Sequence, residues 1–402
     1  MLNIMVTKNG GGVQEFDAEK FKRRLSMAFG ARELDKHGKS NVDRLASLVI
    51  SKLGVSVNSR DIDRIASEVA SQLESTDLEF GVAATNIEVD LICKETPSTF
   101  FKAMRRASNL LCEDFFNLIM RYADVLDTMI VGERDELLSY VSLKAMRRTY
   151  LLRDEEELYE RPQYMFLRVA LFIHGSDMDS VLKTYDMLST LKYMHASPTL
   201  FNAGTKNHQL SSCFILPAHP EPDDIFSTLD IASTISRGGG GIGLGFHLVP
   251  SKGSKVDGVT RAGLVPVLKV FDAAMDVIDQ GVNKRPSAIS AYLVPWHADI
   301  LRRPLVGISI RCLSFKNAYL NILSMKRVEL DQEWTLFCPS RVPHLVQLTG
   351  DDFENEYERL EQEGIGKMKV PARTLWREII DSMIECGGPS ILFKDAVNGE
   401  PE

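Results

Sequence analysis

Apolar and polar residues alternate at helical spacing along most of the first half of the chain. Within residues 1–93 this 3.6-residue repeat predicts three helices behind a short strand and a glycine-rich turn. The predicted helices span residues 17–29, 42–53 and 62–73. Asp17 is expected to cap the first of them, just before Lys20, and the SVNSRD segment before the third is predicted to be a turn. Residues 100–205 continue the pattern with almost no strand signal, so they are predicted to be helical.

The pattern changes at Ser211. Short apolar runs now stand between glycine, proline and polar turns, namely CFIL, GIGLGF, LVPVLKVF and AYLV. Runs of this length between turn residues are typical of buried strands, and strands that alternate with helices predict βαβ units around a mostly parallel sheet. The predicted fold class is therefore α/β, with a helical N-terminal part.

Length and composition are those of an ordinary globular protein. The 402 residues are 44% hydrophobic and 25% charged, which excludes a wholly disordered, collagenous or coiled-coil chain. A net charge of −8 argues against a nucleic-acid partner, because proteins that bind the phosphate backbone are strongly basic. The chain shows no signal peptide and no apolar segment of about 18 residues, so we expect a cytoplasmic protein without a membrane partner. Six cysteines form no CxxC pair, so neither a metal site nor a disulfide scaffold is expected.

The glycine-rich run RGGGGIGLGF allows two interpretations. It formally contains GxGxxG at Gly238, Gly240 and Gly243, as dinucleotide-binding proteins do. However, that motif needs a hydrophobic strand before it, and the preceding DIASTIS segment is predicted to be a polar helix. The alternative is a place where backbones pack closely, with Arg237 available for an anion.

The segment from Met194 to Leu216 contains the most promising chemistry. Hydroxyl side chains stand at Ser197 and Ser212, and the second leads directly into Cys213 at the start of an apolar strand. A thiol at the mouth of a barrel strand, beside hydroxyls, suits nucleophilic or redox chemistry. The alternative is a buried structural cysteine, because no histidine base can be assigned to it.

These motifs resemble a known family. The pairing of HASPTLFNAGT with QLSSCF resembles the large (alpha) subunit of class I ribonucleotide reductase, and ERPQYMFLRVA, GGIGLG, GLVPVLKVFD, DQGVNKRPSA, YLVPWHADI and LFCP agree in order. The opening VTKNGGGVQEFDAEK is similar to the family's N-terminal ATP-cone. The resemblance implies an ATP-cone-like regulatory domain over residues 1–94 and a helical domain over 95–210. It implies the first part of a ten-stranded α/β barrel over 211–402.

The resemblance also implies roles for individual residues. Cys213 matches one cysteine of the redox pair that reduces ribonucleoside diphosphates during thiyl-radical catalysis, and Ser197 and Ser212 match residues that contact the substrate. The positions that match the allosteric activity site are Lys8, Gln14, Lys20, Ser59, Asp63 and Lys94. The positions that match the allosteric specificity site are Glu221, Asp223, Arg237, Asp257 and Gly258.

Several partners follow from the same resemblance. ATP, dATP and other nucleoside triphosphates would act as effectors, and a small (beta) subunit would hold the radical-generating metal centre. Thioredoxin or glutaredoxin would be the reductant, and two large subunits would form a homodimer. The family's Asn-x-Cys-x-Glu segment is not found in these 402 residues, which are therefore expected to be truncated and inactive alone. The alternative is a non-catalytic nucleotide-binding or subunit-interaction protein derived from the family.

Some positions depart from the family's pattern. Asn9 and Gly10 replace an Arg-Asp pair in the cone, which predicts weaker binding of the activity effector. Pro250 replaces an arginine that reaches the specificity effector, and Val282 replaces a loop glycine. Residues 301–324 contain no acidic residue and match nothing in the family, which indicates a disrupted or misjoined stretch.

Overall fold

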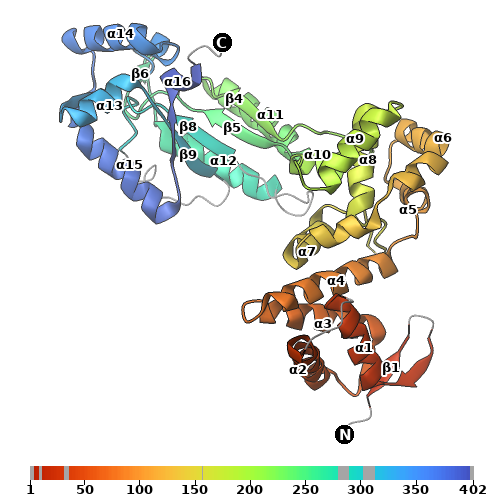
Figure 1. Ribbon diagram of the computed structural model, residues 1–402. Helices are drawn as coiled ribbons and strands as arrows, with labels where there is room; N and C mark the ends of the chain where they lie inside the picture. The colour runs from red at the N-terminus through yellow and green to blue at the C-terminus, as the bar shows by residue number, and fades with distance from the viewer. Residues whose placement is uncertain are drawn as a thin grey trace. The chain divides into compact units, whose positions relative to one another are not determined.

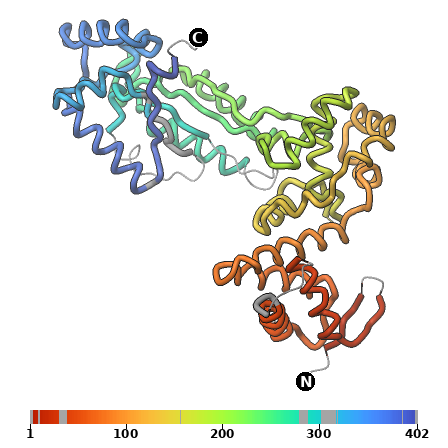
Figure 2. The backbone as a smooth tube through the Cα atoms, viewed as in Figure 1, coloured from red at the N-terminus to blue at the C-terminus, as the bar shows by residue number. Residues whose placement is uncertain are grey.

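The structure is a computed structural model that describes residues 4–8, 11–30, 36–155, 157–278, 289–301 and 313–398. The chain divides into two compact units, Met1–Leu210 and Ser211–Glu402. Both can be followed by colour in Figures 1 and 2, and each is described by itself. Among the described residues, no helix is both long and apolar enough to cross a bilayer.

A small sheet and four helices open the first unit. The elements are β1 (Met5–Thr7), β2 (Val13–Glu15), α1 (Ala18–Ala28), α2 (Lys36–Lys52), β3 (Ser56–Asn58), α3 (Ser59–Leu73) and α4 (Leu78–Glu95). Strand β1 pairs antiparallel with β2 and parallel with β3. The Asp17 carboxylate accepts a hydrogen bond from the Lys20 amide at 2.9 Å, which confirms the predicted cap.

Strand β3 corrects one prediction. The SVNSRD segment was predicted to be a turn, but its first three residues form β3 and the next three begin α3. Val57 lies opposite Val6 in the parallel ladder. A three-residue strand has no periodicity of its own to detect, and its partner lies about fifty positions away in the sequence.

Helices form the rest of the first unit, as predicted. They are α5 (Phe100–Arg106), η1 (Ala107–Asn109), α6 (Glu113–Met129), η2 (Gly132–Leu137), α7 (Tyr140–Thr149), α8 (Pro162–His174), α9 (Met178–Ser189) and α10 (Ser197–Asn202). A fully buried ion pair joins Arg168 on α8 to Glu160, with Nε 2.6 Å from Oε1. Arg168 also donates to the carbonyl oxygens of Leu200 and Ala203, so it holds α10 against α8.

An open parallel sheet forms the centre of the second unit (Figure 1). Its order is β12–β9–β8–β5–β4, and every neighbouring pair is parallel. The strands are β4 (Cys213–Pro217), β5 (Gly241–Gly245), β8 (Ile289–Leu293), β9 (Leu313–Leu320) and β12 (Ser390–Phe393). These strands and the helical first unit confirm the predicted α/β class with part of a barrel.

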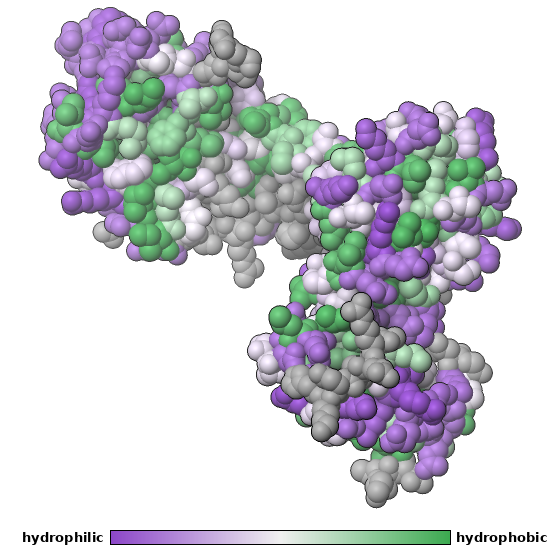
Figure 3. All heavy atoms as spheres, in the orientation of Figure 1, coloured by the Kyte–Doolittle hydropathy of each residue, from purple (hydrophilic) through white to green (hydrophobic). Residues whose placement is uncertain are grey.

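Helices and two small ladders surround this sheet. The helices are α11 (Pro222–Arg237), α12 (Leu264–Ile278), α13 (Ile322–Glu329), η3 (Pro343–Val346), α14 (Gly350–Gln362), α15 (Ala372–Cys386) and α16 (Lys394–Asn398). The ladders pair β6 (Lys255–Val256) with β7 (Val259–Thr260), and β10 (Glu333–Leu336) with β11 (Met368–Pro371). Figure 3 shows the outward face of α14 as strongly hydrophilic, while its Phe353, Tyr357 and Leu360 are buried.

Of the four apolar runs after Ser211, three form strands and one begins a helix. CFIL, GIGLGF and AYLV supply β4, β5 and β8, but LVPVLKVF begins helix α12 rather than a strand. Its proline is the third residue of α12, where no intrahelical donor is lost, and Leu264, Leu268, Phe271 and Met275 are buried at helical spacing. The prediction failed because the run was judged over eight residues rather than over the whole fifteen-residue helix.

The glycine-rich run follows helix α11 and leads into β5, so the strand stands after the glycines rather than before them. A Cβ atom at Gly240 would lie 2.7 Å from atoms of Ile235 and Phe214. A Cβ atom at Gly243 would lie 2.7 Å from the Tyr292 ring. The close-packing interpretation therefore holds, and the dinucleotide-binding interpretation is wrong.

Candidate functional site

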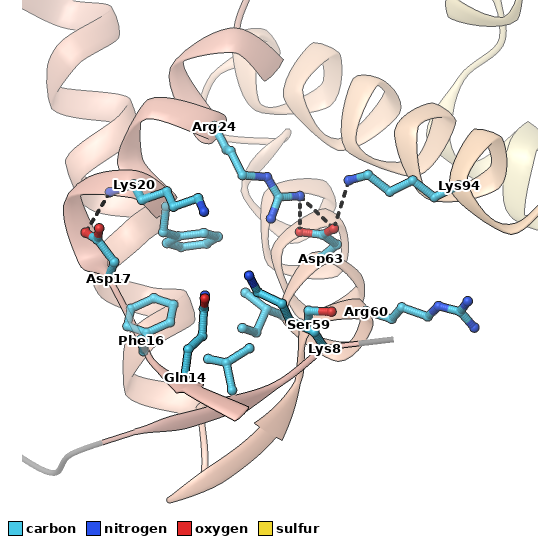
Figure 4. A pocket seen from close by; sticks show the side chains of 13 residues that line it. Lys8, Gln14, Phe16, Asp17, Lys20, Arg24, Ser59, Arg60, Asp63 and Lys94 are labelled. Atoms are coloured by element: carbon cyan, nitrogen blue, oxygen red, sulfur yellow. Dashed lines mark hydrogen bonds and ion pairs between the residues drawn. The ribbon is translucent and has the colours of Figure 1, made fainter. Parts of the chain in front are cut away.

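A pocket of about 420 Å³ lies in the first unit among the small sheet, α1, α3 and the end of α4 (Figure 4). The structure brings all six predicted activity-site residues into its wall: Lys8, Gln14, Lys20, Ser59, Asp63 and Lys94. Apolar side chains complete the wall, namely Val6, Phe16, Phe21 and Ile62. The pocket thus combines an apolar surface with polar groups from β2, α1, α3 and α4 and from Lys8, which directly follows β1.

Positive charge predominates around this pocket. Its lining includes five basic residues (Lys8, Lys20, Arg24, Arg60 and Lys94) and two acidic ones (Asp17 and Asp63). Figure 4 shows Lys8 and Lys20 directed toward the hollow, whereas Arg60 points away from it. Ser59 is the first residue of α3, and a helix N-terminus favours negative charge. An apolar wall beside a cluster of cations suits a ligand with a flat apolar part and a polyanionic part.

Asp63 is the most constrained side chain of the pocket. It is buried, and Arg24 Nη2 donates to both of its carboxylate oxygens at 2.6 and 2.7 Å. Lys94 Nζ lies farther away, at 3.5 Å from Oδ2, and is closer to Asp90. Sequence reasoning missed Arg24, although it follows Lys20 by four positions and so shares a helix face with a residue that was predicted.

The predicted redox thiol lies at the start of β4, an edge strand of the described sheet. Cys213 is exposed, so the interpretation as a buried structural cysteine is wrong. The Ser212 hydroxyl lies 3.4 Å from Cys213 Sγ, and the Ser212 carbonyl oxygen accepts from the Gly241 amide at 2.7 Å. Hydrogen bonding to the sheet therefore fixes the backbone on either side of an accessible thiol.

Ser197, predicted to contact the substrate, belongs to the first unit and begins helix α10. Its hydroxyl lies 2.8 Å from the hydroxyl of Tyr150. Arg168 fixes α10 through two main-chain carbonyl groups, so the position of Ser197 depends on the buried Arg168–Glu160 pair.

Arg237 lies far from Glu221 and Asp223, with which it was predicted to share the specificity site. Glu221 and Asp223 lie at the N-terminus of α11, whereas Arg237 ends the same helix, about 21 Å away at 1.5 Å per residue. Asp257 and Gly258 form the turn between β6 and β7, both with positive φ angles of 51° and 79°. Their grouping into one effector site stays a prediction.

A separate apolar pocket of about 240 Å³ contains Pro250 in its wall. Arg261 lines the same pocket and donates to Glu221 Oε2 at 3.1 Å. Asn9, Gly10 and Val282 lie outside the described residues, as does much of the stretch 301–324.

Comparison with known proteins gives the same family as the motifs. A family model described as "Ribonucleotide reductase, barrel domain" matches residues 211–401, and one described as "Ribonucleotide reductase, all-alpha domain" matches residues 136–208. The ribonucleoside-diphosphate reductase large chain of Schizosaccharomyces pombe is 33% identical over 416 residues, which cover 98% of this chain and 51% of that protein.

Two further relatives are similar to the chain in identity and in coverage. The ribonucleoside-diphosphate reductase large subunit of Caenorhabditis elegans is 38% identical over 415 residues, 98% of this chain and 52% of that protein. The large subunit of Variola virus is 36% identical over 375 residues, 88% of this chain and 49% of that protein. The chain belongs to the ribonucleotide reductase large-subunit family, and it spans about half the length of these curated relatives.

Proposed function

We propose that this chain acts in the reduction of ribonucleoside diphosphates to deoxyribonucleoside diphosphates, which supplies DNA precursors. Family membership supports the reaction, and the pocket in the first unit supports nucleotide control of it. The observation that carries the proposal is the convergence of six predicted residues, spread from Lys8 to Lys94, on one predominantly basic pocket. We propose that this pocket binds ATP or dATP as an effector.

The apolar part of the pocket would hold the base, and the cations would hold the phosphates. Phe16, Phe21 and Ile62 offer a surface on which a planar ring can pack. Lys8 and Lys20 act as point charges for a polyphosphate, and charge-assisted hydrogen bonds of this kind are about twice as strong as neutral ones.

Cys213 would supply one of the two thiols consumed in each turnover. The 2′ hydroxyl of the ribose leaves as water, two thiols become one disulfide, and their two electrons end in the new C–H bond of the product. The exposed position of Cys213 at a strand end suits this role, because a substrate and a reductant must both reach the sulfur. Ser197 and Ser212 would contact the substrate through hydroxyl and backbone donors.

The partners belong to the same proposal. A small subunit would generate the radical at its own metal centre, and thioredoxin or glutaredoxin would reduce the disulfide. A second large subunit would complete a homodimer in the cytoplasm. In the reductase that contains this chain, we expect Cys213→Ser to abolish dCDP formation from CDP. The matched variant Cys338→Ser, at a buried thiol outside the proposed site, should leave turnover intact.

Calorimetry of the full chain with ATP tests the nucleotide site. Lys20→Ala removes a pocket cation and should weaken ATP binding by about ten-fold or more, the equivalent of one charge-assisted hydrogen bond. Lys22→Ala is the matched control, because Lys22 lies on the same helix but pairs with Asp43 outside the pocket. Equal effects of the two substitutions would contradict the proposal.

A further inference from the structure

The Asp63 carboxylate is the only acidic group among the described pocket residues that is buried in the wall, and it needs a fixed partner there. A buried carboxylate is costly unless it is paired and hydrogen-bonded. Arg24 Nη2 supplies that partner at 2.6 and 2.7 Å, bonding both oxygens at once. Lys94 is 3.5 Å away and bonds Asp90 more closely, so Arg24 is the closer partner of the carboxylate and bonds both of its oxygens.

Arg24 is part of the wall of two cavities. Arg24, Phe21 and Asp63 line both the 420 Å³ pocket and a neighbouring hollow of about 260 Å³. Figure 4 shows the guanidinium directed from α1 toward Asp63, while Lys8 and Lys20 are directed toward the hollow. Arg24, Asp63 and Phe21 therefore lie where the two cavities adjoin.

The charge around Arg24 is already neutralised. Besides Asp63, its guanidinium has Asp90 at 3.8 Å. By contrast, the Lys8 and Lys20 side chains have no ion pair with any residue in the part of the chain that the structure describes. These two lysines are the cations available to phosphates, whereas Arg24 is committed to a carboxylate.

From this geometry we infer that Arg24 is a positioning residue, which orients Asp63 to accept a hydrogen bond from the nucleoside part of the effector. An ionised carboxylate has about four acceptor sites, and Arg24 occupies one on each oxygen. A second acceptor site on each oxygen remains for the ligand once Lys94 turns from Asp63 to the phosphates. The inference rests on the proposed nucleotide pocket. It adds that Asp63 contacts the nucleoside, whereas Lys8 and Lys20 contact the phosphates.

Two ligands separate these roles in calorimetry on the full chain. ATP carries a nucleoside, whereas inorganic tripolyphosphate offers the phosphates alone. We expect Arg24→Gln and Asp63→Asn each to weaken ATP binding by about ten- to a hundred-fold and to leave tripolyphosphate binding unchanged. Lys20→Ala should weaken both ligands, and Arg23→Gln, at an exposed neighbour on the same helix, should weaken neither.

The double variant tests whether Arg24 acts through Asp63. If it does, Arg24→Gln combined with Asp63→Asn should weaken ATP binding no more than Asp63→Asn alone. Arg24→Lys keeps the positive charge but lacks the planar guanidinium, so it should recover part of the ATP affinity lost in Arg24→Gln. If Arg24→Gln fails to fold, Arg24→Lys offers the same test.

Three outcomes would overturn the inference. Additive losses in the double variant would show that Arg24 and Asp63 act independently. An equal loss of tripolyphosphate binding in Arg24→Gln would place the guanidinium on the phosphates. Failure of the unsubstituted chain to bind ATP at all would overturn the nucleotide pocket itself. This outcome is distinct from failure of the Arg24 inference, because it is seen before any residue is substituted.

Discussion

Asp135 offers a test of the first unit's packing that needs no ligand. It lies in η2 with 1% of its surface exposed, and burial raises the pKa of its carboxyl from 3.8 to about 6. Oδ1 accepts a hydrogen bond from the backbone amide of Gln163 at 3.2 Å, but Oδ2 accepts no hydrogen bond from any described residue. The nearest cation is Arg161, whose Nε is 4.0 Å from Oδ2 and only partly offsets the effect of burial on the pKa.

The sign of the effect follows from where the proton binds more tightly. The folded pKa lies above the unfolded one, so the carboxyl favours folding most below about pH 4 and loses this contribution as the pH rises to about 6. The change from 3.8 to about 6, at about 1.4 kcal/mol for each pKa unit, corresponds to about 3 kcal/mol of unfolding free energy. Asp135→Asn keeps the shape of the side chain and removes the titration.

The assay is urea unfolding of the full chain between pH 4 and pH 7, followed by the helical circular dichroism signal. We expect the unfolding free energy of Asp135→Asn to rise relative to the unsubstituted protein by about 2.4 kcal/mol over this range, most of the full effect. Asp124→Asn, at an exposed position in α6, should show no such trend. A constant difference between Asp135→Asn and the unsubstituted protein from pH 4 to pH 7 would contradict this expectation, because burial would then not raise the pKa of Asp135.

Three further predictions follow from other parts of the chain. Arg168→Met should destabilise the first unit by about 3–5 kcal/mol in denaturant unfolding, since it leaves the Glu160 carboxylate buried and unpaired, and adding Glu160→Gln should recover part of the loss. Asn9→Arg should tighten ATP binding in calorimetry by about ten- to a hundred-fold, and an unchanged affinity would show that residue 9 does not contact the phosphates. Labelling with a thiol reagent should be fast at Cys213 and slow at Cys338, because the first is exposed and the second buried; equal rates would contradict the position of β4.

Local patterns in the sequence predicted much of the fold. The cap at Asp17 depends on two residues three positions apart, and the helices of residues 100–205 depend on spacing within each element. Contacts between distant segments escaped prediction. Strand β3 exists because Val57 pairs beside Val6, and no property of three isolated residues indicates that.

The residues of the candidate site also depend on contacts between distant segments, which local sequence patterns do not predict. Lys8 and Lys94 come together only because β1 and the end of α4 pack around the same hollow, so their relation came from family resemblance rather than from spacing. Arg24 could have been found from its helical register with Lys20, but its bond to Asp63 depends on how α1 packs against α3. Exposure of Cys213 likewise depends on β4 being an edge strand, which is a property of the strand order.

The measurement that tests the nucleotide pocket most directly is lysine acetylation of the full chain, with and without ATP, read by mass spectrometry. We expect ATP to protect Lys8, Lys20 and Lys94, which line the pocket, and to leave Lys22 and Lys52 as reactive as before. Equal protection of all five lysines, or of none, would contradict the assignment of the pocket as the effector site.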